Sequence, residues 1–110
     1  MFRGINAINL DSKGRCAMPS RYRDALTTQC KGHVVLTSDT EERCLLLYPL
    51  PIWEGIETKI AALPSFNVQA RRIQRLLMGH ATELELDGQG RLVLPPLLRD
   101  YAHIDKKLIL

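Results

Sequence analysis

Two short stretches of the sequence share the form Asp-x-x-Gly-Arg, at residues 11–15 and 87–91. An arginine guanidinium is a planar fork of N–H donors that binds guanine O6 and N7, or a phosphate, through two hydrogen bonds at once. Lys13 adds a second positive charge to the first stretch, where the second has Gln89. Arginine and lysine side chains on a narrow turn indicate salt-dependent binding of nucleic acid.

Both stretches have the residue types of a tight turn between two strands. Gly14 and Gly90 allow the positive φ angle that such a connection needs. Asp11 and Asp87 can accept hydrogen bonds from the backbone N–H groups of their own turns. We therefore expect these four residues to organise two rigid turns, each of which holds an arginine outward.

The first stretch is the stronger candidate for contact with DNA. Arg15 and Lys13 suit base reading and phosphate neutralisation, and Arg3 is expected to lie near the base of the same turn. Arg91 occupies the position of Arg15 in the second stretch, but Gln89 replaces the lysine there, so we expect weaker DNA binding or a structural role for it. The spacing alone also allows an alternative in which each arginine only pairs with the aspartate of its own turn.

Positive charge is concentrated at the start of the chain. The formal net charge of the 110 residues is only +3, but five Lys and Arg residues against two Asp residues fall within the first 25. The composition, with 45% hydrophobic and 25% charged residues, is typical of a folded globular protein. The three cysteines have no C-x-x-C spacing and no histidine cluster beside them, so we expect no disulfide framework, no metal site and no cofactor.

The sequence offers little for membrane insertion or catalysis. No apolar run approaches the roughly 20 residues that a bilayer-spanning helix needs, and no signal segment is recognisable at the start, so we expect a cytoplasmic protein without a membrane partner. An enzyme would have to use His80 with Asp87 or Glu83 as an acid–base pair. Because no nucleophile motif, phosphate-cradling loop or metal-ligand spacing accompanies that pair, we expect neither catalysis nor a small-molecule substrate.

The two stretches belong to a longer internal repeat. A shift of 76 residues places residues 10–24 on residues 86–100 with seven identities in 15 positions, where chance would give about one. In both copies an apolar strand leads into the turn, a second apolar strand ends in proline, and a short helix follows. Each copy is therefore expected to be a hairpin capped by a helix.

The elements around the repeat follow from the same patterns. Trp53 lies on the apolar stripe of an amphipathic segment and is expected in the core. Arg71, Arg72 and Arg75 form a basic stripe that we expect to be a solvated helix face or a subunit contact. We expect strands at residues 5–10, 34–36, 44–48, 81–86 and 108–110, and helices at residues 21–26, 51–63, 67–78 and 97–102.

The expected fold class is α+β, mainly β, with two pseudo-symmetric hairpin units joined by two helices. The units are expected at residues 1–50 and 79–110, with the connecting helix pair at residues 51–78. The second unit has begun the strand at residues 108–110 when the sequence stops, and a partner strand for it is lacking. We therefore expect the second unit to be truncated.

The repeated Asp-x-x-x-Arg, followed by an apolar strand and a proline, resembles the SpoVT-AbrB type of DNA-binding element, and the whole chain is similar to the MraZ family. The resemblance rests on residues 1–4, 11–15, 45–49, 71–80 and 87–91. It implies two SpoVT-AbrB-like units arranged as a swapped-hairpin barrel.

The resemblance also implies a function. MraZ proteins are bacterial transcriptional regulators that repress the division and cell-wall gene cluster in which they are encoded, and they bind repeated promoter boxes as ring-shaped oligomers. We therefore expect a nucleoid-associated repressor whose partners are double-stranded DNA with tandem promoter boxes and further copies of itself. The alternative from another class is an oligomeric scaffold without specific DNA binding, in which the duplicated hairpins form subunit interfaces.

Overall fold

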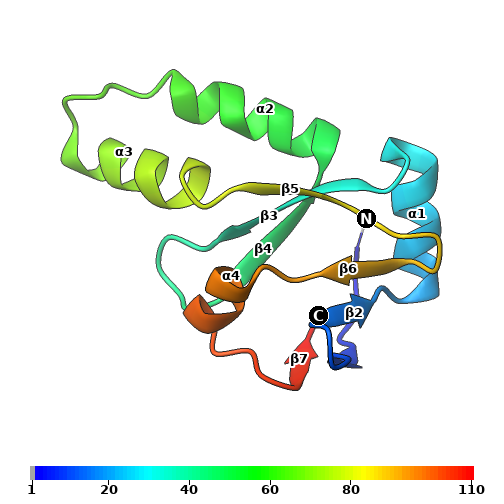
Figure 1. The fold of residues 1–110 in the computed structure, drawn as a ribbon. Coiled ribbons are helices and arrows are strands. Elements are labelled where there is room, and N and C mark those ends of the chain that lie inside the picture. Colours follow the sequence, from blue (N-terminus) through cyan, green and yellow to red (C-terminus); the bar gives the residue numbers. More distant parts are fainter. Residues whose placement is uncertain (1) are drawn as a thin grey trace.

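Short antiparallel strands and surrounding helices make up the computed structural model, which describes residues 2–110 (Figure 1). The strands are β1 (Ala7–Asn9), β2 (Arg15–Ala17), β3 (His33–Ser38), β4 (Leu45–Pro49), β5 (Thr82–Glu85), β6 (Arg91–Val93) and β7 (Lys107–Ile109). The helices are α1 (Ser20–Cys30), α2 (Leu50–Ala61), α3 (Val68–Ile73) with the π-helical turn η1 (Gln74–Met78) directly after it, and α4 (Pro96–Tyr101). The expected α+β class is confirmed. The helices contain more residues than the strands, so the expectation of a mainly β protein is wrong.

Proline sets the start of three helices. Helices α1, α2 and α4 follow directly after Pro19, Pro49 and Pro95, whose φ angles are −51°, −57° and −57°. Because proline has no N–H group and a fixed φ, it ends strand pairing and suits the first turn of a helix. Helix α1 ends at Cys30, and the next residue, Lys31, adopts the left-handed conformation with φ of 56°.

Strands of the two copies pair with each other. β1 pairs with β7, β2 pairs with β6, and β3 lies between β4 and β5 in a three-stranded sheet. Within the first copy, the strands that flank the turn are joined only by the bridge between Leu10 and Cys16. The predicted regular hairpin within each copy is therefore wrong. These strands have only three residues each, and an isolated two-stranded hairpin is at best marginally stable in water, so the strands are better stabilised when they pair across a shared core.

The β2–β6 pairing follows a pseudo-two-fold axis. Its middle pair joins Cys16 to Leu92, which occupy the same position of the 76-residue repeat. The two flanking pairs exchange under that shift, and they are Arg15 with Val93 and Ala17 with Arg91. The repeat in the sequence is thus a symmetry relation within the fold.

One apolar core serves both copies. Leu26 and Val34 of the first copy are 1% and 0% exposed, and Leu92 of the second copy is 2% exposed. Side chains removed from water in this way provide most of the stabilisation of a small domain. Neither copy has a core of its own.

Helices α2 and α3 lie side by side on one side of the β4-β3-β5 sheet (Figure 1). Trp53 of α2 is 3% exposed, as its place on the apolar stripe predicted, and its indole N–H donates to Glu57 at 2.6 Å. Asn67 caps α3, because its side chain accepts hydrogen bonds from the backbone N–H groups of Gln69 and Ala70. None of the helices within residues 2–110 is both long and apolar enough to cross a membrane.

Candidate nucleic-acid interface

The two-stranded β2–β6 ribbon has a buried face and an outward face. Cys16 and Leu92 point into the core, with 4% and 2% of their surface exposed. Because side chains alternate along a strand, the residues on either side of this pair point outward. Arg15 and Arg91 therefore share the outward face, on opposite strands, together with Val93, which is 53% exposed. The fold brings the arginines of both repeat copies onto one surface.

The same network of hydrogen bonds shapes each turn. Asp11 accepts backbone N–H groups of Lys13 and Arg15 with one carboxylate oxygen, both at 2.9 Å, and the Arg15 Nε–H with the other at 2.6 Å. Asp87 does the same in the second copy, accepting the backbone N–H groups of Gln89 and Arg91 at 2.9 Å and the Arg91 Nε–H at 2.9 Å. The two turns thus have matching geometry.

The aspartates orient the guanidinium groups and leave part of each free. Each carboxylate binds only the Nε atom, and the terminal nitrogens of Arg15 and Arg91 make no hydrogen bond within residues 2–110. Those terminal N–H groups are the ones that form a two-pronged contact with a base edge or a phosphate. The arrangement is suited to binding an anionic or acceptor-rich ligand over the ribbon.

The carboxylates of both turns stay ionised well below neutral pH. Backbone N–H donation from Arg15, with further donation from its side chain and from Lys13, lowers the pKa of Asp11 from its ordinary value of 3.8 to about 2. Backbone donation from Arg91 is also the largest influence on Asp87, whose pKa is lowered too. Hydrogen bonds to the charged form of a carboxylate favour that form, so neither turn changes its charge near neutral pH.

We expect the first turn to keep one structure from pH 8 to pH 5 and to loosen only in strong acid. Because the folded-state pKa of Asp11 is depressed, its contribution is complete above pH 3.8 and is lost as the pH falls towards 2. Amide chemical shifts of Lys13 and Arg15, followed by nuclear magnetic resonance, should therefore move together with a midpoint near pH 2. A midpoint at 3.8 or above would contradict the observed hydrogen bonding.

Two further candidates lie outside the ribbon strands. Lys13 is exposed within the first turn, as Gln89 is within the second. Arg3 is exposed before β1, and its carbonyl accepts a hydrogen bond from the hydroxyl of Tyr22 in α1. Lys13 thus adds positive charge beside Arg15, whereas Arg3 is not part of the β2–β6 ribbon.

Sequence reasoning missed two arginines behind the turns. It assigned no function to Arg23 or Arg99, yet Arg23 lies against Gly90 and Arg99 lies against Gly14. Arg23 and Arg99 together form one of the seven identities of the repeat, which is the signal that could have found them. Their location became visible only with the pairing of the copies.

The acid–base pair considered from the sequence does not assemble. The Nδ1 atom of His80 lies 2.8 Å from the hydroxyl of Ser38, and its ring packs edge-on against Tyr101. Ser38 is fully buried, so this contact is closed to a substrate. Within the described part of the chain, no group of three or more His, Cys, Asp and Glu side chains is arranged to hold a metal ion.

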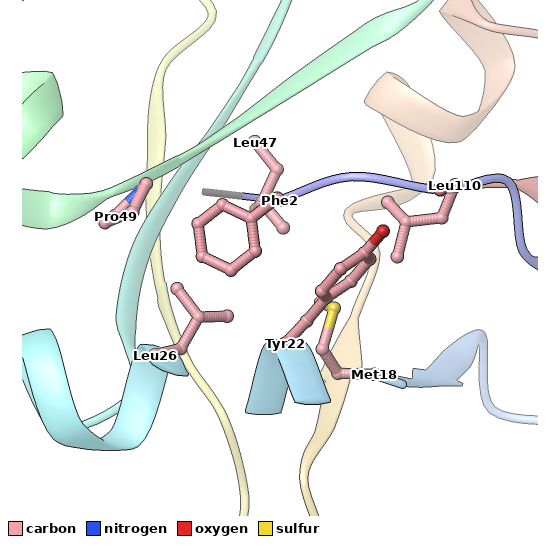
Figure 2. A pocket seen from close by; sticks show the side chains of 8 residues that line it. Phe2, Met18, Tyr22, Leu26, Leu47, Pro49 and Leu110 are labelled. Carbon is pink, nitrogen blue, oxygen red and sulfur yellow. The ribbon is translucent and has the colours of Figure 1, made fainter. Parts of the chain in front are cut away.

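An apolar cavity of about 140 Å³ lies between α1, β4 and the two ends of the chain (Figure 2). Phe2, Tyr22 and Leu110 point towards one another across it, and its remaining lining residues are likewise uncharged. The hydroxyl of Tyr22 is already engaged by the carbonyl of Arg3. The cavity therefore lacks the charged groups that acid–base chemistry requires.

Comparison with known proteins places these features in a family. The family model described as "MraZ protein, putative antitoxin-like" matches residues 1–76 and 77–110. Proteins named transcriptional regulator MraZ are similar over all 110 residues, which are 73% of each relative: those of Alkalilimnicola ehrlichii at 61% identity, Thioalkalivibrio sulfidiphilus at 59% and Pseudomonas aeruginosa at 57%. Because the match extends over the whole sequence, the chain belongs to the MraZ family.

Proposed function

We propose that this chain is a DNA-binding transcriptional regulator that lays the outward face of the β2–β6 ribbon on double-stranded DNA. The observation that carries this proposal is the presence of Arg15 and Arg91 on one outward face, each with terminal N–H groups that make no hydrogen bond to residues 2–110. A two-stranded ribbon has the width that the major groove of B-DNA admits. The relatives' common name, transcriptional regulator MraZ, supports the same conclusion.

We assign a different role in DNA recognition to each polar residue on or beside the ribbon. Arg15 reads a guanine edge, Lys13 neutralises a phosphate beside it, and Arg91 makes the weaker contact from the second copy. Asp11 and Asp87 hold the two guanidinium groups in place. Arg3 contributes a further phosphate contact at the edge of this surface.

We further propose that SpoVT-AbrB-like units at residues 1–50 and 79–110 form a swapped-hairpin barrel, with residues 51–78 as the connecting helix pair. Strand pairing between the copies, β1 with β7 and β2 with β6, supports this arrangement. A single ribbon contacts too few base pairs to select a promoter. We propose that a ring of identical subunits binds tandem promoter boxes, which raises the affinity through effective concentration, and that this binding represses the division and cell-wall gene cluster.

A titration of two fluorescent duplexes tests the proposal. One duplex carries the sequence upstream of the protein's own gene, and the other has the same bases in scrambled order. We expect tighter binding to the first duplex, and an affinity for both that falls as salt is raised. Equal binding to the two duplexes, or none to either, would favour an oligomeric scaffold over a specific regulator.

Exchanging the residues that distinguish the two turns should exchange their contributions. Because both turns have matching geometry, Lys13→Gln removes one phosphate contact from the first turn and Gln89→Lys adds one to the second. The plot of log affinity against log salt should become shallower by about one unit for the former and steeper by about one unit for the latter. Unchanged slopes in both variants would show that the turns do not face the phosphates.

A further inference from the structure

Each turn is backed by an arginine that belongs to the other copy. Arg23 of α1 lies against the second turn, so that a Cβ atom on Gly90 would lie 2.7 Å from the Nε of Arg23. Arg99 of α4 lies against the first turn, and a Cβ atom on Gly14 would lie 2.8 Å from its Nη1. Arg23 and Arg99 are related by the same 76-residue shift as the turns. The two contacts therefore form a reciprocal pair.

The glycines make these contacts possible for two reasons. Gly14 and Gly90 both have φ of +74°, a conformation that residues with a side chain rarely adopt. The absence of a Cβ atom also leaves the space that each guanidinium group occupies. The turn motif is thus shaped by a residue on the far side of the repeat as well as by its own aspartate.

Hydrogen bonds strengthen one of the two contacts. The Nη2 of Arg23 donates to the carbonyl of Gly88 at 3.2 Å, which fixes the second turn from behind. The Nε of Arg99 is buried and has no hydrogen-bond partner within residues 2–110. Arg99 therefore acts on the first turn by packing against Gly14 from a half-buried position.

The opposite copy also bonds to each turn through the backbone: the N–H of Leu94 donates to the carbonyl of Gly14 at 3.0 Å, and the N–H of Met18 donates to that of Gly90 at 2.9 Å. β2 and β6 have three residues each, and the turns lie at opposite ends of this short ribbon. A small tilt of a turn displaces the terminal nitrogens of the arginine that follows it. Contacts with a base edge tolerate little displacement, because two hydrogen bonds must form together.

We propose that Arg23 and Arg99 are positioning residues, each of which holds the DNA-binding turn of the other copy. Arg99 positions Arg15 through the first turn, and Arg23 positions Arg91 through the second. The inference deepens the proposed function and rests on it where DNA is concerned. It also makes a statement about the free protein that can be tested without DNA.

Amide chemical shifts of the full chain without DNA test the structural part. Arg99→Ala should move the amide signals of residues 11–15 and leave those of residues 87–91 in place, and Arg23→Ala should do the reverse. Arg75→Ala removes the same charge from η1, which contacts α2, α3 and β3, and should move neither group. Shifts confined to the turn of the same copy, or equal shifts in both turns, would overturn the inference.

The functional part is tested by measuring how tightly single and double variants bind the upstream duplex. The double variants combine Arg99→Ala or Arg23→Ala with Arg15→Ala or Arg91→Ala. Arg99→Ala alone should weaken binding about tenfold. In the Arg15→Ala background it should cause no further loss of affinity, whereas in the Arg91→Ala background it should cause the same tenfold loss as in the parent protein. Arg23→Ala should couple to Arg91→Ala instead. Independent effects in all combinations would overturn the positioning role.

Lysine variants separate positioning from direct contact with a phosphate, and they also serve if an alanine variant fails to fold. Arg99→Lys and Arg23→Lys keep the charge but lose the planar fork. Positioning predicts that they still move the opposite turn and still weaken binding, whereas full affinity in both would overturn it. If no duplex binds the parent protein but the shifts are crossed, the inference about the turns holds and the proposed function fails.

Discussion

Replacing Arg15 by alanine should weaken binding to the upstream duplex by about 30- to 150-fold, or about 2–3 kcal/mol. The substitution removes the terminal N–H groups that Asp11 does not bind and one positive charge close to Lys13 in the sequence. The fold should persist, because an ion pair that is partly exposed to water contributes little to stability. Fluorescence anisotropy at fixed salt measures the affinity, and circular dichroism monitors the fold.

Arg91→Ala is the matched control for this experiment. It breaks the same kind of ion pair in a turn of the same geometry, but that turn carries Gln89 in place of a lysine. We expect a loss of roughly fivefold, or about 1 kcal/mol. An Arg15→Ala variant that binds as tightly as the parent protein would remove the central contact from the proposal, whatever the result for Arg91→Ala.

Replacing Leu92 by alanine should lower the free energy of unfolding by about 2–5 kcal/mol. Leu92 is 2% exposed and pairs with Cys16 at the centre of the β2–β6 ribbon, so the cavity left behind would lie in the core shared by both copies. Domains of this size are stable by only about 5–15 kcal/mol, so the variant should lose a large part of its stability. Urea denaturation followed by tryptophan fluorescence measures the change.

Val93→Ala tests whether the effect comes from burial. Val93 is the next residue along β6 but points outward with 53% of its surface exposed, so we expect a change within about 0.5 kcal/mol. The same substitution shortens a side chain that lies opposite Arg15 and two residues after Arg91. Similar losses of stability for both variants would mean that the ribbon does not have one buried and one exposed face.

Local patterns in the sequence predicted the helices well. The apolar stripe of residues 51–63 corresponds to α2 at Leu50–Ala61, and residues 97–102 correspond to α4 at Pro96–Tyr101. Helix α1 extends to Cys30, four residues beyond the predicted end, because the chain continues until Lys31 adopts a left-handed conformation. Proline and apolar spacing act over a few residues, so a single sequence reveals them.

The choice of strand partners could not be predicted in this way. Alternation of apolar and polar residues indicates which face of a strand is buried, but it does not say which strand lies beside it. In the structure β1 pairs with β7, and Ala7 lies opposite Ile109. The two strands are about 100 residues apart in the sequence, so this contact is highly non-local. The predicted local hairpins failed for this reason.

Only the local part of the candidate site could be predicted from the sequence. The Asp-x-x-Gly-Arg stretches contain all the residues that bond to one another within each turn, so their local geometry could be inferred from spacing. The shared outward face of Arg15 and Arg91 depends on the pairing of β2 with β6. The contacts of Arg23 and Arg99 depend on it as well, and these were missed.

The pseudo-two-fold axis at Cys16 and Leu92 relates two halves of one chain whose sequences differ. A ribbon assembled from two identical chains would meet a duplex in either orientation with equal energy. Here Lys13 marks one end and Gln89 the other, so the DNA complex that we propose has a defined polarity along the helix axis. Reversing a non-palindromic box relative to its neighbours should therefore reverse the protomer that sits on it.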